Sequence, residues 1–124
     1  MADARATRGR LAELLVWGWL ALRGWSALGR RVRVGGVEID LLMRRGRVLA
    51  LVEVKSRSHP GPPPDLLVTA RQRGRLARAA RSLAGRRGGL LVRIDLAEVT
   101  WRPFPRIRVH AGAWPADMDR QSMR

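Results

Sequence analysis

The chain has 124 residues, of which 25 are Lys or Arg and 10 are Asp or Glu, so its formal net charge is +15. This length fits a single domain. A hydrophobic content of 46% is enough to build a core and excludes a wholly disordered basic tail. The lack of cysteine excludes disulfides, zinc–thiolate sites and a cysteine nucleophile. The excess positive charge favours a polyanionic partner, with nucleic acid first and an anionic membrane second.

The basic residues are almost entirely arginine, and Lys55 is the single lysine among them. Codon usage alone explains one remaining lysine without giving it a role. The alternative is that this position needs an ammonium group, which is compact and can change its protonation state, whereas a guanidinium stays charged. Lys55 is therefore a candidate functional residue.

The N-terminal part predicts a buried amphipathic helix over residues 8–23, with Gly24 as its stop. The apolar stretch Leu14–Leu22 has the outline of a signal peptide, but Glu13 precedes it, Arg23 ends it and no small-residue cleavage pattern follows. This stretch is also too short to cross a bilayer, which needs about 20 residues. We therefore expect a soluble cytoplasmic protein, with a helix lying on a membrane surface as the alternative.

Three strands are predicted next, over residues 30–34, 37–43 and 48–55. Gly35-Gly36 separates the first two, and residues 44–47 form a turn before the third. The third strand is apolar until its charged end, which is typical of a central strand covered on both faces.

A second, strongly basic helix is predicted after the proline-rich surface loop His59–Asp65. Thr69 is its expected N-cap, and the helix extends to about Ala84. Strands over 90–96 and 107–110 follow. The order of helix, three strands, helix and two strands predicts an α/β fold with a mixed sheet flanked by helices.

One domain is expected to occupy residues 8–114. Residues 1–7 are predicted to form a flexible N-terminus, and the polar residues 115–124 a flexible C-terminal tail.

Three acids and the lysine fall on two neighbouring predicted strands. Glu38 and Asp40 are two residues apart on one strand, and Glu53 and Lys55 are two residues apart on the next. Because side chains alternate along a strand, each pair shares a face of the sheet.

The short turn between these strands predicts an antiparallel hairpin. If Met43 pairs with Val48, Glu38 lies opposite Glu53, and Asp40 is a diagonal neighbour of Glu53 at about 7 Å. A slip of one residue would put the two acid pairs on opposite faces, and the sequence leaves this register open.

Clustered carboxylates in an apolar sheet repel each other unless a cation lies among them. Lys55 supplies one positive charge, and a divalent ion would supply two more. All-oxygen ligands suit Mg²⁺ or Mn²⁺ better than zinc or copper. We therefore predict a metal site at Asp40 and Glu53. The alternative is an exposed strand edge on which Glu53 and Lys55 form a weak ion pair.

These residues also carry a family resemblance. Glu38-Ile39-Asp40-Leu41-Leu42 and Val52-Glu53-Val54-Lys55-Ser56-Arg57 resemble the motifs G-E-I-D-L-I and F-V-E-V-K-x-R of the bacterial UPF0102 (YraN-like) family. The resemblance covers about residues 8–114 and includes weaker matches at Gly9, Glu13, Gln72-Arg73, Arg78-Ala79-Ala80, Arg93-Ile94-Asp95 and Pro105-Arg106. Val37 and Leu51 depart from the pattern, and neither touches the proposed chemistry.

The family in turn resembles the restriction-endonuclease-like fold, with its PD-(D/E)xK metal-nuclease constellation. The resemblance implies Asp40 and Glu53 as metal ligands and Lys55 as the lysine of that motif. Glu13 resembles the helix-one acid of archaeal Holliday-junction resolvases, which implies a further ligand. Family membership of this kind implies a fold more firmly than an activity.

The expected function is a Mg²⁺- or Mn²⁺-dependent nuclease in which Asp40 and Glu53 hold the ion and Lys55 orients or deprotonates the attacking water. The partner is nucleic acid, with DNA as the expected form, and its phosphates would contact basic side chains: Arg57, Arg71, Arg73, Arg75 and Arg78.

Two alternatives stay open. One is a non-catalytic nucleic-acid-binding module on the same scaffold, and the other is an interaction protein that uses its five tryptophans. The oligomeric state is open and includes a homodimer. Asp95 is expected to form a structural pair with Arg93, and His59 and His110 are given no role. Glu38 either supports the acid site indirectly or pairs with an arginine.

Overall fold

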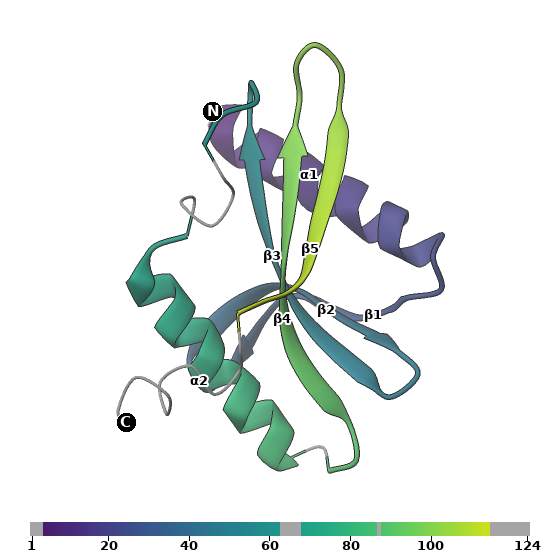
Figure 1. Ribbon diagram of the computed structural model, residues 1–124, viewed down its shortest axis with the longest axis vertical. Helices are drawn as coiled ribbons and strands as arrows, with labels where there is room; N and C mark the ends of the chain where they lie inside the picture. Colours follow the sequence, from purple (N-terminus) through teal and green to yellow (C-terminus); the bar gives the residue numbers. More distant parts are fainter. Residues whose placement is uncertain (1–3, 63–67, 87, 115–124) are drawn as a thin grey trace.

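The computed structural model describes residues 4–62, 68–86 and 88–114, which form a five-stranded sheet and two helices (Figure 1). The elements in chain order are α1 (Ala4–Ala21), β1 (Ser26–Val34), β2 (Val37–Arg45), β3 (Val48–Arg57), α2 (Ala70–Arg86), β4 (Leu91–Thr100) and β5 (Arg106–Trp114). The strands lie in sequence order; β3 and β4 are parallel, and all other neighbours are antiparallel. The predicted α/β class, the mixed sheet and the order of elements are confirmed.

Helix α1 begins at Ala4, four residues before the predicted start, because residues 4–8 contain no helix breaker. Residues 4–7 are therefore helical, although the sequence placed them in a flexible N-terminus. Residues 1–3 and the predicted tail 115–124 lie outside the described residues. Gly24, with a φ of 89°, closes the end of the helix as expected. Neither helix of the described chain is long and apolar enough to cross a membrane.

Strand β1 begins at Ser26, four residues earlier than predicted. Pairing with β2 extends to Ser26↔Arg44, but an irregularity between Ala27 and Gly29 interrupts the alternation of side chains there. The alternation of apolar and polar residues in the sequence therefore indicates only the second half of this strand.

Two tight turns set the register of the first three strands. Gly35 and Gly36 both have positive φ, at 57° and 78°, as a two-residue type I′ hairpin requires. Between β2 and β3 the turn also has two residues, because Arg45 pairs with Val48, and Gly46 supplies the positive φ of 60°.

The expected four-residue turn was therefore wrong, and Met43 pairs with Ala50 instead of Val48. The difference is two residues, so paired side chains of β2 and β3 still share a face. The predicted register made Asp40 a diagonal neighbour of Glu53. In the observed register the last pair is Leu41↔Val52, so Asp40 and Glu53, the next residue on each strand, lie opposite each other.

Apolar residues cover both faces of the sheet, with α1 behind it in Figure 1 and α2 on the other face. Strand β3 alternates between them: Ala50 and Val52 pack toward α1, whereas Leu49 and Leu51 pack toward α2. The predicted central strand with two covered faces is confirmed.

Asp95 on β4 has the structural role that the sequence predicted. Its side chain is buried and accepts bonds from Arg93 Nε at 2.9 Å and Arg93 Nη2 at 3.1 Å. The N–H of Gly112 donates a third bond at 2.9 Å, next to the place where the β4–β5 register shifts. Three donors compensate the desolvation of this carboxylate, which therefore anchors β5 to the sheet.

Thr69 caps α2 in the predicted position. Its Oγ1 accepts the Gln72 N–H at 3.1 Å, and Gln72 Oε1 accepts the Thr69 N–H at 3.3 Å, which is a reciprocal capping box. The first turn of α2 thereby satisfies two backbone donors that would otherwise lack partners.

Removal of this cap should destabilise the protein without changing its fold. We expect Thr69→Ala to lower the free energy of unfolding by about 1 kcal/mol, because the Gln72 N–H loses its acceptor. Urea unfolding followed by circular dichroism measures the difference. Thr69→Ser keeps the hydroxyl and is the matched control; equal losses in both variants would show that the cap is not the cause.

Candidate functional site

Two carboxyl groups meet where β2 and β3 separate. The ladder between these strands ends at Leu41↔Val52, and the Oδ2 atom of Asp40 accepts the Val54 N–H at 2.8 Å. Glu53 follows Leu51 by two residues and lines a cavity with Gln72 and Arg75, so it lies on the side of the sheet that α2 covers. Asp40 stands between Ile39, which packs toward α2, and Leu41, which packs toward α1. The structure brings Asp40 and Glu53 together, as the sequence predicted.

Asp40 and Glu53 lie close enough to change the ionisation of Glu53. Burial is the main cause that raises the pKa of Glu53 to about 9, and the hydrogen bond and negative charge of Asp40 raise it further. The charge of Lys55 lowers the pKa and offsets only part of this increase. The neutral form of Glu53 is therefore favoured in the folded protein.

Lys55 lies two residues beyond Glu53 on the same face of β3 and is half-buried. Its neighbour on β4 is Glu98, but the Glu98 carboxylate binds Arg57 at 2.8 Å. Lys55 forms no hydrogen bond or ion pair with another residue of the described chain, so its ammonium group is close to the acids but is not held by them.

Glu13 comes to the same region from α1. Its Oε1 atom accepts a bond from Arg31 Nε at 3.0 Å. The pKa of Glu13 is raised, mainly by burial, although the hydrogen bond from Arg31 lowers it. The negative charge of Asp40 raises the pKa further, so Glu13 and Asp40 lie near each other.

No three acidic, histidine or cysteine side chains within residues 4–62, 68–86 and 88–114 are arranged as a metal-binding group. The structure therefore brings together Asp40 and Glu53, with Lys55 beside them, and leaves Glu13 bound to Arg31. Direct metal ligation by Glu13 stays a prediction. The two-acid donor set is all oxygen, which suits Mg²⁺ or Mn²⁺.

A small cavity of about 200 Å³ opens beside Glu53, between the β1–β2 turn and α2. Glu38, Gln72 and Arg75 line it together with Arg33. Glu38 thus faces the approach to the acid pair. The sequence did not predict Gln72 as part of this surface; the signal that could have indicated it is the Gln72-Arg73 match to the family motif.

The predicted nucleic-acid contacts divide into two groups. Arg71, Arg75 and Arg78 are exposed on α2, and with Gly74 and Arg81 they line a groove of about 450 Å³, the arginine groove. Arg73 is half-buried.

Arg57 differs from these residues, because its side chain is only 17% exposed and its guanidinium binds Glu98 and the carbonyl of Pro62. It is therefore a less accessible phosphate contact than the residues of α2, and its contact with nucleic acid stays a prediction.

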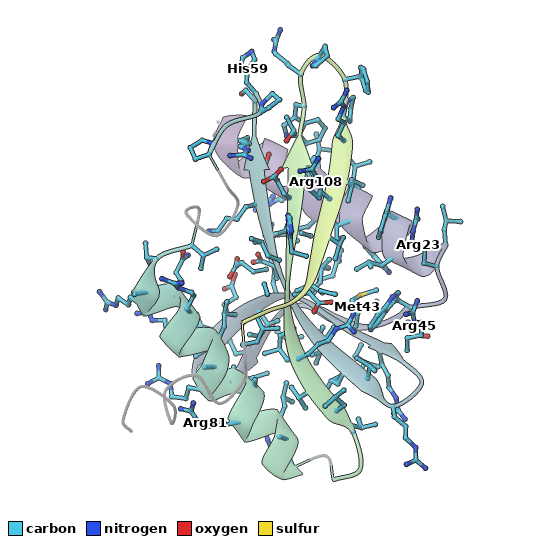
Figure 2. The ribbon with its side chains drawn as sticks, viewed as in Figure 1. Arg23, Met43, Arg45, His59, Arg81 and Arg108 are labelled. Carbon is cyan, nitrogen blue, oxygen red and sulfur yellow. The ribbon has the colours of Figure 1, made fainter. Side chains whose placement is uncertain are left out.

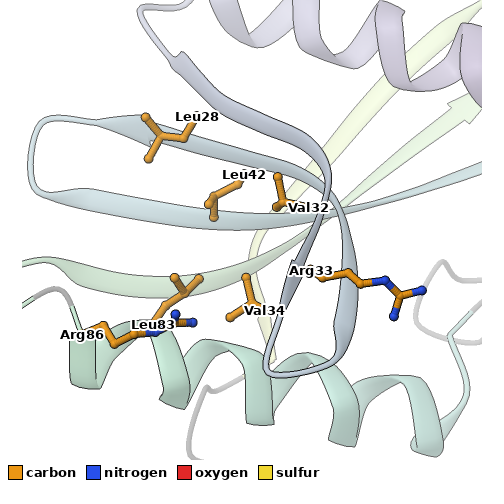
Figure 3. A pocket seen from close by; sticks show the side chains of 7 residues that line it. All are labelled: Leu28, Val32, Arg33, Val34, Leu42, Leu83 and Arg86. Atoms are coloured by element: carbon orange, nitrogen blue, oxygen red, sulfur yellow. The ribbon is translucent and has the colours of Figure 1, made fainter.

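A larger groove of about 560 Å³ lies between β1, β2 and the C-terminal half of α2 (Figure 3). Its walls are aliphatic, from Leu28, Val34 and Leu83 among others, with Arg33 and Arg86 at its ends. It contains no acid or nucleophile, so the chemically capable groups of this protein are at the smaller cavity beside Glu53.

The fold and this site define a small α/β protein with an acid pair and one lysine at the end of a central hairpin. The model of "Uncharacterised protein family UPF0102" matches residues 12–114. The chain therefore belongs to the UPF0102 family, as the resemblance of its motifs predicted.

Relatives in the same family span most of the chain. A UPF0102 protein of Sphingopyxis alaskensis is 41% identical over 109 residues, which are 86% of this chain and 93% of the relative. One of Caulobacter sp. (strain K31) is 44% identical over 110 residues, 86% of this chain and 77% of the relative. One of Caulobacter vibrioides is 48% identical over 91 residues, 71% and 72% of the two chains.

Among solved structures, Pyrococcus furiosus SfsA in complex with Ca²⁺ has a TM-score of 0.45 and 18% identity, covering 86% of this chain and 63% of that chain. A similarity of this size does not bear on the roles of individual residues.

The raised pKa of Glu53 predicts how stability depends on pH. In the unfolded chain Glu53 ionises near its ordinary pKa of 4.5, whereas in the folded protein its pKa is about 9. The stability that Glu53 contributes is therefore complete below about 4.5 and is lost as the pH rises toward 9. Glu53→Gln cannot ionise, so we expect it to become more stable than the wild type by about 1–3 kcal/mol as the pH rises.

Urea unfolding over a series of pH values measures this difference. Glu38→Gln, which removes an exposed carboxylate, is the control for loss of one acid. A Glu53→Gln effect that is constant over the whole pH series would show that Glu53 is not protonated in the folded state.

Proposed function

We propose that this protein is a Mg²⁺- or Mn²⁺-dependent nuclease that hydrolyses phosphodiester bonds in nucleic acid, with DNA as the first substrate to test. The observation that carries the proposal is the close pairing of Asp40 and Glu53 at the end of the β2–β3 ladder. Two half-buried acids side by side, one of them with a raised pKa, are costly for stability alone, and groups of this kind gather at functional sites.

The residues present fit a divalent metal ion. Asp40 and Glu53 would hold it. When Glu53 loses its proton, two neighbouring carboxylates repel each other, and a divalent cation relieves this repulsion. When bound, such an ion polarises the scissile phosphate and stabilises the charge that develops on the leaving oxygen.

The protein's own groups divide the remaining tasks. The Val54 N–H fixes the orientation of Asp40 through the 2.8 Å bond to Oδ2. The ammonium of Lys55, which no described residue holds, donates to a phosphate oxygen or to the attacking water. The arginine groove on α2 contacts flanking phosphates without reading the sequence of bases.

A second candidate is a module with the same fold that binds nucleic acid but does not cleave it. The observation in its favour is that the described residues contain two converging acids and not three. The two candidates differ in metal affinity: a module without catalysis needs no Mg²⁺ or Mn²⁺ bound at Asp40 and Glu53.

Catalysis by these residues predicts a specific pattern of inactivation. We expect the wild type to cleave DNA in Mg²⁺ or Mn²⁺, and Asp40→Asn, Glu53→Gln and Lys55→Met each to lower the rate at least about 100-fold. Linear, single-stranded and branched oligonucleotides, with RNA alongside, are the substrates of a gel assay. Arg47→Gln, in the turn between β2 and β3, is the control and should keep the wild-type rate within about twofold. Cleavage that survives Asp40→Asn and Glu53→Gln would assign the activity to a contaminant.

Metal binding should become stronger as the pH rises. Because Glu53 must release its proton before both carboxylates can bind a dication, we expect the affinity for Mn²⁺ to increase by up to about tenfold per pH unit near neutrality. Titration calorimetry in buffers of different ionisation enthalpy measures both the affinity and the proton released. We expect Asp40→Asn to lose Mn²⁺ binding. If the affinity of the wild type for Mn²⁺ does not change with pH, the acid pair is not the binding site.

A further inference from the structure

A second basic pocket lies beyond the acid pair, where β3 and β4 end and β5 begins. Its volume is about 410 Å³, and its walls include Arg57, Gly61 and Glu98 together with Arg106 and Arg108 from β5. Figure 2 shows Arg108 on the upper half of β5, far from the part of α2 that carries Arg81. This pocket is therefore separate from the arginine groove.

The pocket has an uncompensated positive charge. Three arginines and one glutamate line it, and Arg57 neutralises Glu98 through the 2.8 Å ion pair. Arg106 and Arg108 are exposed, and neither forms an ion pair with any residue of the described chain. Two positive charges are therefore left for a ligand, which matches the charge of a phosphate group.

The floor of the pocket is built before any ligand binds. Glu98 and Thr100 are each only 6% exposed, and Arg57 is held at both ends of its guanidinium by Glu98 and the Pro62 carbonyl. Arg57 Nε is buried and has no hydrogen-bond partner in the described chain. A buried donor without a partner is uncommon, and a bound anion is one means of satisfying it.

Sheet geometry connects this pocket to the acid pair. Glu53, Lys55 and Arg57 alternate along β3 and so lie on one face, with about 13 Å of strand between the first and the last. Glu98 pairs with Lys55 on one side and with Arg108 on the other, and paired residues also share a face. The acid pair, the lysine and the arginines thus form one continuous track across the sheet.

We infer that this pocket binds a phosphate group of the substrate strand other than the one that is cleaved. The identity of that strand rests on the proposed nuclease function, whereas the preference for phosphate rests on the pocket itself. The phosphate is either a backbone phosphodiester or a terminal phosphomonoester, since both present negatively charged non-bridging oxygens to the arginines.

The test compares two variants that lose the same charge. Arg106→Gln/Arg108→Gln removes the two pocket arginines that form no ion pair within the described residues, and Arg44→Gln/Arg47→Gln removes two exposed arginines at the opposite end of the β2–β3 hairpin. Fluorescence anisotropy, in EDTA to prevent cleavage, measures binding of DNA oligonucleotides with and without a 5′-phosphate at several salt concentrations.

We expect the pocket variant to bind DNA at least about tenfold more weakly than the wild type, and the affinity of the control variant to change less than about threefold. The number of counterions released on binding, read from the salt dependence of the affinity, should fall by about two in the pocket variant. A loss confined to 5′-phosphorylated DNA identifies a terminal phosphate, and a loss on both oligonucleotides identifies the backbone. Equal losses in the two variants would overturn the inference, because they would reflect net charge alone.

A second measurement separates this inference from the nuclease proposal. Inorganic phosphate is titrated into the protein while the Nε–H resonance of Arg57 is followed by NMR. A shift in the wild type that is absent from Arg106→Gln/Arg108→Gln supports the pocket even if no nucleic acid binds, in which case the proposed function fails alone. The absence of any shift, with normal DNA binding by the pocket variant, overturns the pocket and leaves the nuclease proposal standing.

Discussion

The close approach of Asp40 and Glu53 is the interaction on which the rest of the site depends. Two carboxyl groups can approach each other in a largely apolar sheet only if one is neutral or a cation lies between them. The two-residue turn at Gly46 makes this approach possible, because it sets the β2–β3 register that ends the ladder just before the two acids. A backbone detail at one end of the hairpin thus decides the chemistry at the other end.

The large positive charge is divided between structure and surface. Arg31, Arg57 and Arg93 each bind an acid, and Arg93 fixes the buried Asp95. Other arginines lie over aromatic rings: Arg23 over Trp19, Arg30 over Trp17, Arg45 over Trp25 and Arg106 over Phe104. These contacts cover aromatic surface that an interaction protein would otherwise offer to a partner. Arg71, Arg75 and Arg78 of α2, in contrast, are exposed around a groove.

Within this pattern, the single lysine has a distinct place. Arginines of β3 and β4 are held by carboxylates, whereas Lys55 stands between the acid pair and the Arg57–Glu98 ion pair without being bonded to either. An ammonium at this position can donate in several directions, while a guanidinium would form a fork with the nearest carboxylate. This difference gives a physical reason for a lysine here in a chain that otherwise uses arginine.

By itself, the sequence determined the elements and their order, because periodicity and glycine positions are local properties of the chain. It predicted Asp40, Glu53 and Lys55 on one surface only for one register of the hairpin, and it left that register open. Only the tertiary structure decided that Asp40 lies opposite Glu53, that Arg31 binds Glu13 and that Glu98 binds Arg57. Those outcomes depend on turn length and on contacts between residues distant along the chain, which no local pattern contains.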